Sequence, residues 1–179
     1  MQGSQPIRYL VILSTDESGD VSAGAVTLGR IAAPYYFFKD QGAEVVLATL
    51  TGGYPCLPDY RETDTHEKSL RRFLLDRAAR DELADTLAAD QIVAEDFDAA
   101  LCLGLSGALW GNCTNSVTAI LTTLLENGKP VAVIPGKAVA IAPHGAGEGL
   151  LIFGDSDNAP IMAAHALAAI VTQRRSHVA

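Results

Sequence analysis

Residues 130–137 read Pro130-Val-Ala-Val-Ile-Pro-Gly-Lys137 and follow a helical stretch that stops at Asn127-Gly128. The apolar run predicts a buried strand that enters a sharp turn at Pro135. A strand without polar alternation, reached through a helix, is typical of a parallel sheet in an α/β protein. In many α/β enzymes the residue at such a turn is the nucleophile, but Pro135, Gly136 and Lys137 offer none for acyl transfer. The stretch therefore predicts a parallel α/β fold but contains no candidate nucleophile.

Helical and strand-like patterns alternate on both sides of this stretch. Strands are predicted at 7–13, 43–48, 98–103 and 131–134, and helices at 28–41, 67–88 with a break near Arg80, 115–126 and 160–174. The segments 137–142 and 150–153 are also strand-like, and the glycine-rich residues between them predict a β-hairpin. This order predicts one domain over residues 1–179, with a doubly wound, mostly parallel α/β sheet sandwiched by helices.

The composition limits the classes of partner and compartment. The chain has 179 residues, is 49% hydrophobic and carries a formal net charge of −8 at pH 7. This acidity argues against nucleic acid or an anionic membrane as the main partner, and the apolar runs are shorter than the roughly 18 residues that a membrane span needs. The three cysteines stand at unrelated spacings and indicate neither a disulfide framework nor a zinc site. We therefore expect a cytoplasmic protein without a metal or cofactor.

Several stretches of sequence resemble the ThiJ/PfpI family of class I glutamine-amidotransferase-like proteins, and in particular its branch of chaperone-like glyoxalases. The matching stretches are 32–46, which begins Ala-Ala-Pro-Tyr-Tyr, Phe73-Leu, Glu95-Asp-Phe-Asp-Ala99, Gly104-Leu-Ser-Gly-Ala-Leu-Trp110, 128–133 and 149–154. The resemblance covers roughly residues 7–135 and 148–174. It implies a flavodoxin-like fold and a homodimer. The predicted hairpin at 137–153 adds strand edges that need pairing or protection, so we expect it to take part in the dimer.

The same resemblance implies catalytic residues that this chain lacks. The family's nucleophilic Cys and the His beside it correspond to Pro135 and Gly136, and its supporting Glu corresponds to Arg30. The helix that follows the family's nucleophile is also missing, and the predicted hairpin stands in its place. Losing the thiol, its His and the acid together removes the groups that lower a thiolate pKa. The sequence therefore predicts a shortened member of the family without its thiol chemistry.

Ligands of open α/β sheets bind at the carboxyl ends of the strands. We expect the segments 14–20, 104–113, 135–137 and 155–158 to converge there, with Arg30 reaching in from its helix. The predicted degenerate pocket contains Glu17, Arg30, Ser106, Gly107, Pro135, Gly136 and Lys137. Arg30 is either a helix-surface residue paired with an acid, or a pocket residue whose charge is neutralised by a neighbouring acid such as Asp16 or Glu17 or by a small anionic ligand.

Two functions remain open on this evidence. The first is a non-catalytic module that binds a small anion or a partner protein. The second is a hydrolase or glyoxalase-like lyase with relocated catalytic residues, such as Glu17, Cys113 or Lys137. A hydrogen bond between Cys113 and His144 would favour the second function. Cys102 lies in an apolar strand and is predicted to be a buried hydrophobic residue.

Overall fold

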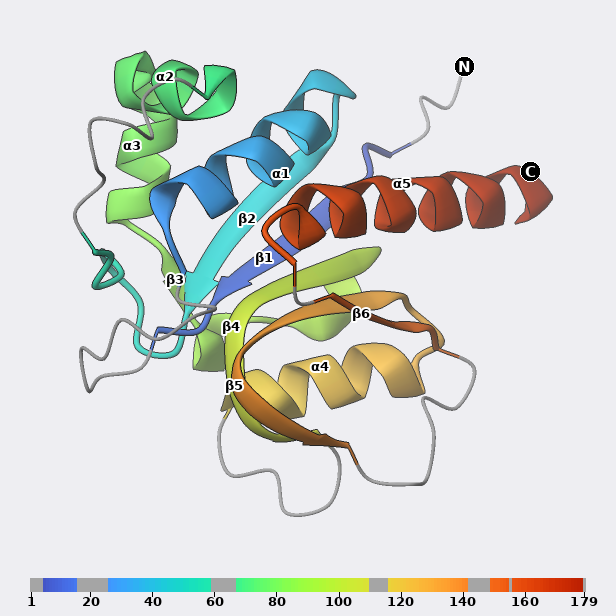
Figure 1. Ribbon diagram of the computed structural model, residues 1–179. Coiled ribbons are helices and arrows are strands. Elements are labelled where there is room, and N and C mark those ends of the chain that lie inside the picture. Colours follow the sequence, from blue (N-terminus) through green and yellow to red (C-terminus); the bar gives the residue numbers. More distant parts are fainter. Residues whose placement is uncertain are drawn as a thin grey trace.

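The computed structural model describes residues 5–15, 26–58, 67–109, 116–141, 149–154 and 156–178. In this part of the chain, six strands form one sheet in the order β3-β2-β1-β4-β5-β6 (Figure 1). They are β1 Arg8–Leu13, β2 Glu44–Thr49, β3 Leu87–Ala88, β4 Ala99–Leu109, β5 Val131–Ile141 and β6 Leu151–Phe153. All neighbouring strands run parallel, so the predicted parallel, flavodoxin-like α/β fold is confirmed.

Strand β1 lies in the middle of the sheet because the chain turns to opposite sides after it. Val11 pairs with Leu47 of β2 on one side and with Leu101 of β4 on the other. The next strand along the chain lies to one side of β1, and the later strands lie to the other. The space outside the carboxyl ends of β1 and β4 is therefore the position where open α/β sheets bind ligands.

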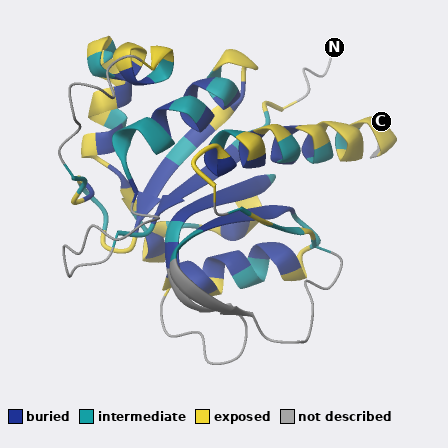
Figure 2. Cartoon of the chain, viewed as in Figure 1, coloured by how far each residue is buried: buried dark blue, intermediate teal, exposed yellow. Residues whose placement is uncertain are grey.

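Helices cover both faces of the sheet (Figure 1). One face carries α1 Leu28–Asp40 and α5 Ala159–Val178, with α2 Lys68–Leu75 and α3 Arg77–Ala84 packed outside α1. The other face carries α4 Ser116–Glu126 and the 3₁₀ turns η2 Ala89–Gln91 and η3 Ala94–Asp96. Strand β1, most of β2, and residues 99–105 of β4 and 131–134 of β5 are almost fully buried between these layers (Figure 2), which explains their continuous apolar sequences.

The break in the second predicted helical segment, 67–88, occurs four residues earlier than expected. We placed it near Arg80, whereas α2 ends at Leu75 and α3 begins at Arg77. Asp76 lies between them with extended backbone, and its Oδ1 accepts a hydrogen bond from the Ala79 N–H at 3.2 Å. An aspartate that satisfies a free N–H of the next helix is a favourable N-cap, so the side chain of Asp76 sets the break.

The predicted turn at Pro135 and the predicted hairpin over 137–153 are both wrong. Strand β5 continues through Pro135 to Ile141, and Pro135 pairs with Leu105 at an irregularity in the register with β4. Strand β6 then pairs in parallel with the first half of β5, from Val131 opposite Leu151. A proline is tolerated in a strand where the ladder is already interrupted. Residues 104–109, which lie beyond the predicted strand 98–103, likewise continue strand β4.

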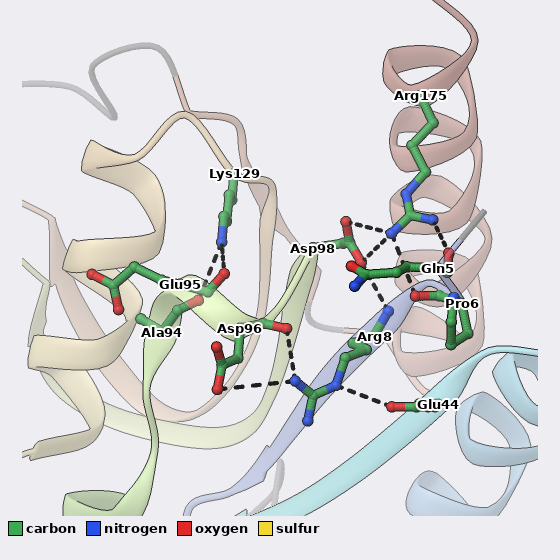
Figure 3. Close-up of polar contacts among 10 residues, drawn as sticks. All are labelled: Gln5, Pro6, Arg8, Glu44, Ala94, Glu95, Asp96, Asp98, Lys129 and Arg175. Carbon is green, nitrogen blue, oxygen red and sulfur yellow. Dashed lines mark hydrogen bonds and ion pairs between the residues drawn. The ribbon is translucent and has the colours of Figure 1, made fainter. Parts of the chain in front are cut away.

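A polar network fastens the amino ends of β1 and β4 to the carboxyl end of α5 (Figure 3). Both carboxylate oxygens of Asp98 accept hydrogen bonds from the Arg175 guanidinium, at 2.8 and 2.9 Å, and one accepts a bond from the Arg8 backbone N–H. Arg175 also donates to the Gln5 carbonyl at 2.6 Å. A shallow hollow of about 470 Å³ opens beside Arg175, between Gln5 and Gln41. This network lies at the edge of the sheet opposite to the expected ligand site.

No helix within the described ranges is long and apolar enough to cross a membrane.

Candidate functional site

The carboxyl ends of β1, β4 and β5 meet in close backbone packing. The Ser14 N–H donates to the Leu103 carbonyl at 2.8 Å, which holds the end of β1 against β4. Gly104 has a φ of +83°, and a Cβ at this position would overlap the Ser14 carbonyl oxygen and a methyl group of Val26. Only glycine fits such a backbone conformation in so little space. Val26, which precedes α1, is only 4% exposed and closes this corner of the edge.

Gly136 stands where the family resemblance puts the histidine beside the nucleophile. A Cβ at Gly136 would lie 2.6 Å from the Gly104 carbonyl oxygen, so the backbones of β4 and β5 are in direct contact here. Because Pro135 pairs with Leu105 and Gly136 continues the same strand, this segment forms no turn that could present a nucleophile. Residues 135–136 therefore pack β5 against β4.

Arg30 lies in the first turn of α1, whose N-cap is Thr27. The Thr27 hydroxyl accepts a hydrogen bond from the Arg30 N–H at 3.3 Å. The Arg30 guanidinium donates to the Ser156 carbonyl at 3.4 Å and lies 3.6 Å from Asp157 Oδ1. The Arg30 side chain is 17% exposed, whereas that of Asp157 is fully exposed. The contact confirms the expectation that Arg30 and the segment 155–158 meet.

The electrostatics at Arg30 combine one cation with two helix N-termini. Helices α1 and α5 pack against each other, and both begin at the carboxyl edge of the sheet. Their free N–H groups contribute partial positive charge there. Carboxylates are also close, since Asp157 pairs with Arg30 and the Glu67 carboxylate oxygen would lie 3.5 Å from a Cβ at Gly29. One guanidinium, two carboxylates and the N-termini of two helices thus lie at this edge of the sheet.

The other predicted site residues lie either in strands or outside the described part of the chain. Gly107 pairs with Val139 inside the extension of β4 and β5, so Ser106, Gly107 and Lys137 belong to strands instead of loops. Glu17, Asp16, Cys113 and His144 lie outside the described residues, as does any contact between Cys113 and His144. The sequence reasoning missed Val26 and Thr27. The polar Thr27 ahead of a helical stretch was an N-cap signal that could have found the latter.

The described thiols occupy contrasting environments. Cys102 is fully buried in β4, as predicted, and burial raises the pKa of its thiol to about 12. It is therefore not a thiolate at neutral pH. Cys56 is exposed in the segment after β2. Among the residues that the structure describes, no group of three or more His, Cys, Asp or Glu side chains is arranged to hold a metal ion.

Solved structures share this fold, although no protein-family model and no curated protein matches the sequence. The chain is similar to the Rapid Encystment Protein 24 kDa of Francisella tularensis, with a TM-score of 0.66 and 10% identity over 92% of this chain and 99% of that one. It is also similar to glyoxalase III from Candida albicans, with a TM-score of 0.60 and 14% identity over 91% of this chain and 96% of that one. At these identities the likeness shows a common α/β fold.

Proposed function

We propose that this chain is a non-catalytic protein of ThiJ/PfpI-like fold that binds a small anion at Arg30. The observation that carries the proposal is the asymmetry of the Arg30 ion pair. Its guanidinium is largely buried, with 17% of the side chain exposed, but its acidic partner Asp157 is fully exposed and 3.6 Å away. A fully hydrated carboxylate at that distance compensates a buried cation only weakly. An anion that reaches the guanidinium directly can take the place of Asp157.

The surroundings of Arg30 favour a small, doubly charged or bidentate anion. A guanidinium presents parallel N–H donors that match the oxygens of a carboxylate, sulfate or phosphate. The N-terminal ends of α1 and α5 add the positive ends of two helix dipoles. Sulfate, phosphate and small carboxylic acids therefore form the ligand class that we expect.

We propose that the chain is not catalytic because other residues occupy the positions of the family's catalytic Cys, His and Glu. Pro135 has no nucleophilic group, it is paired within β5, and the adjacent Gly136 is packed against Gly104. Arg30 occupies the position that the resemblance gives to an acid and cannot accept a proton at neutral pH. The alternative, a hydrolase or glyoxalase-like lyase, requires a nucleophile from another part of the chain. Cys113 is the residue that the sequence offers for it.

Thermal unfolding at matched ionic strength tests the anion site. Sulfate or phosphate should raise the melting temperature of the wild type above its value in sodium chloride, because a ligand that binds the folded state stabilises it by about 2.7 kcal/mol at 100 times its Kd. Arg30→Gln should abolish this anion-specific shift. Asp157→Asn should enlarge it, since the competing carboxylate is gone.

Arg77→Gln is the matched control. Arg77 also pairs with one aspartate at 3.6 Å, but its side chain is 87% exposed on α3, so the variant should keep the full anion shift. An equal shift in the wild type and in Arg30→Gln would show that the anion binds elsewhere. Loss of the shift in Asp157→Asn would show that the aspartate supports the site, and the competition model would be wrong.

A further inference from the structure

The outward side of α2 is basic and ends in an exposed leucine. Lys68, Arg71, Arg72 and Leu75 are spaced at i, i+3, i+4 and i+7, so they lie along one side of the helix. All four are exposed. Leu75 is 85% exposed, more than any other large hydrophobic residue that the structure describes. The opposite side of α2 is buried against α1, through residues that include Phe73.

Helix α3 continues this basic side, and both helices lie outside α1 with their outward sides exposed (Figures 1 and 2). Arg77 follows Leu75 by two residues and its side chain is 87% exposed, and Arg80 is exposed one turn later. Residues 68–80 contain five basic side chains and one acidic one, a local net charge of +4 in a chain that carries −8. We call this surface the α2–α3 basic face and define it by Lys68, Arg71, Arg72, Leu75, Arg77 and Arg80.

Contacts with α1 hold the α2–α3 basic face in place. The Arg72 guanidinium donates two hydrogen bonds to the Asp40 carboxylate, both at 2.8 Å, and lies over the Tyr36 ring, 3.8 Å from its centroid. The Tyr36 hydroxyl donates to Asp76, between the two helices, at 3.0 Å. A partner therefore meets helices that are already fixed, which lowers the entropy cost of binding.

The basic side chains of this face have little internal compensation. Within the described part of the chain, neither Lys68 nor Arg80 forms an ion pair. Arg77 lies 3.6 Å from the Asp81 carboxylate, but the two side chains are 87% and 71% exposed. Such a hydrated pair contributes little, so a carboxylate from a partner can take the place of Asp81.

We propose that the α2–α3 basic face binds an acidic segment of a partner protein, which carries carboxylates and an apolar side chain that covers Leu75. Charge complementarity supports this occupant, because carboxylates match exposed ammonium and guanidinium groups. Leu75 separates the basic residues of α2 from those of α3, and covering it removes apolar surface from water. An apolar centre with a charged rim is the common arrangement of a protein interface.

The charge of the whole chain favours a short acidic segment over a larger polyanion. Helix α2 has eight residues and spans about 12 Å, the length of about four residues of an extended segment. A nucleic acid or an anionic membrane extends past this face and meets the acidic remainder of the chain. A short segment meets only the basic face, because salt screens charges beyond about 8 Å at physiological ionic strength.

Fluorescence anisotropy with a labelled random copolymer of glutamate and leucine tests the proposal. The random sequence samples many spacings of acidic and apolar residues. The wild type should bind the copolymer, and raising sodium chloride from about 50 to about 200 mM should weaken binding several-fold. Lys68→Glu and Arg80→Glu should each raise the Kd at least about fivefold, because each replaces attraction by repulsion. Leu75→Ser should raise it about fivefold through the lost apolar contact.

Variants elsewhere on the surface are the matched controls. Arg174→Glu changes the net charge as much as Lys68→Glu does, at an exposed residue of α5. Met162→Ser removes an apolar side chain that is 66% exposed on α5. Both should keep the wild-type Kd. Arg30→Gln should also bind the copolymer as the wild type does, which separates this face from the proposed anion site. Circular dichroism melts establish that each variant is folded.

A wild type that does not bind the copolymer overturns the proposal. Equal losses in Lys68→Glu and Arg174→Glu would show that binding follows net charge and not this face, and the proposal would be wrong. Polyglutamate that binds as tightly as the copolymer would remove the role of Leu75. Tighter binding of single-stranded DNA or of phosphatidylserine vesicles than of the copolymer would assign the face to another class of partner and overturn the proposal as well.

Discussion

Gly104→Ala probes the close packing at the carboxyl edge of the sheet. The new methyl group would overlap the Ser14 carbonyl oxygen and a methyl group of Val26, and Gly104 has a φ of +83°. A left-handed conformation costs a non-glycine residue about 1–2 kcal/mol, and forcing an extra methyl group into a packed site costs about 1–3 kcal/mol more. The Ser14 contact is with backbone, which cannot rotate away. We therefore expect a loss of about 2–5 kcal/mol in the free energy of unfolding.

Gly53→Ala separates the two contributions. Gly53 has a φ of +76°, similar to that of Gly104, but a Cβ there would meet no atom within 4 Å. This control should therefore lose only the conformational part, about 1–2 kcal/mol. Urea unfolding followed by far-UV circular dichroism measures both values, and the m-value should stay constant. Equal losses in the two variants would refute the steric argument and with it the close contact of Gly104 with Ser14 and Val26.

Three further predictions concern pH, thiol reactivity and catalysis. The Arg72 side chain holds the pKa of Asp40 below its usual value of 3.8, and hydrogen bonds from the Ala79 N–H and Tyr36 hydroxyl lower that of Asp76. Because the folded state binds these protons less tightly than the unfolded state, stability should fall as the pH drops below about 4, and Asp76→Ala should weaken this dependence in acid melts. Cys102 should react with a thiol reagent only in denaturant, unlike exposed Cys56. Methylglyoxal should be consumed no faster than in buffer; turnover abolished by Cys113→Ala would instead establish the enzymatic alternative.

The sequence alone determined the fold class, because its signals are local. Continuous apolar runs predicted strands buried on both faces, and glycine and polar caps placed most helix ends within a few residues of those observed in α1, α4 and α5. The burial of Cys102 followed from the same runs. The meeting of Arg30 with residues 155–158 followed from a topological rule, since all parallel strands end at one edge.

Only the tertiary structure decided the path of the chain after Ile134. Pro135 and Gly136 have local preferences for turns, but the pairing of Pro135 with Leu105 and the backbone contact of Gly136 with Gly104 keep them in a strand. The sequence predicted a hairpin because two strand-like segments are joined by glycines. In the structure β6 runs parallel to β5, because strand pairing depends on packing contacts across the sheet. The contact between Gly104 and Gly136 joins residues far apart in sequence. Strand pairing and backbone contacts of this kind depend on distant residues, and no pattern within a short window encodes them.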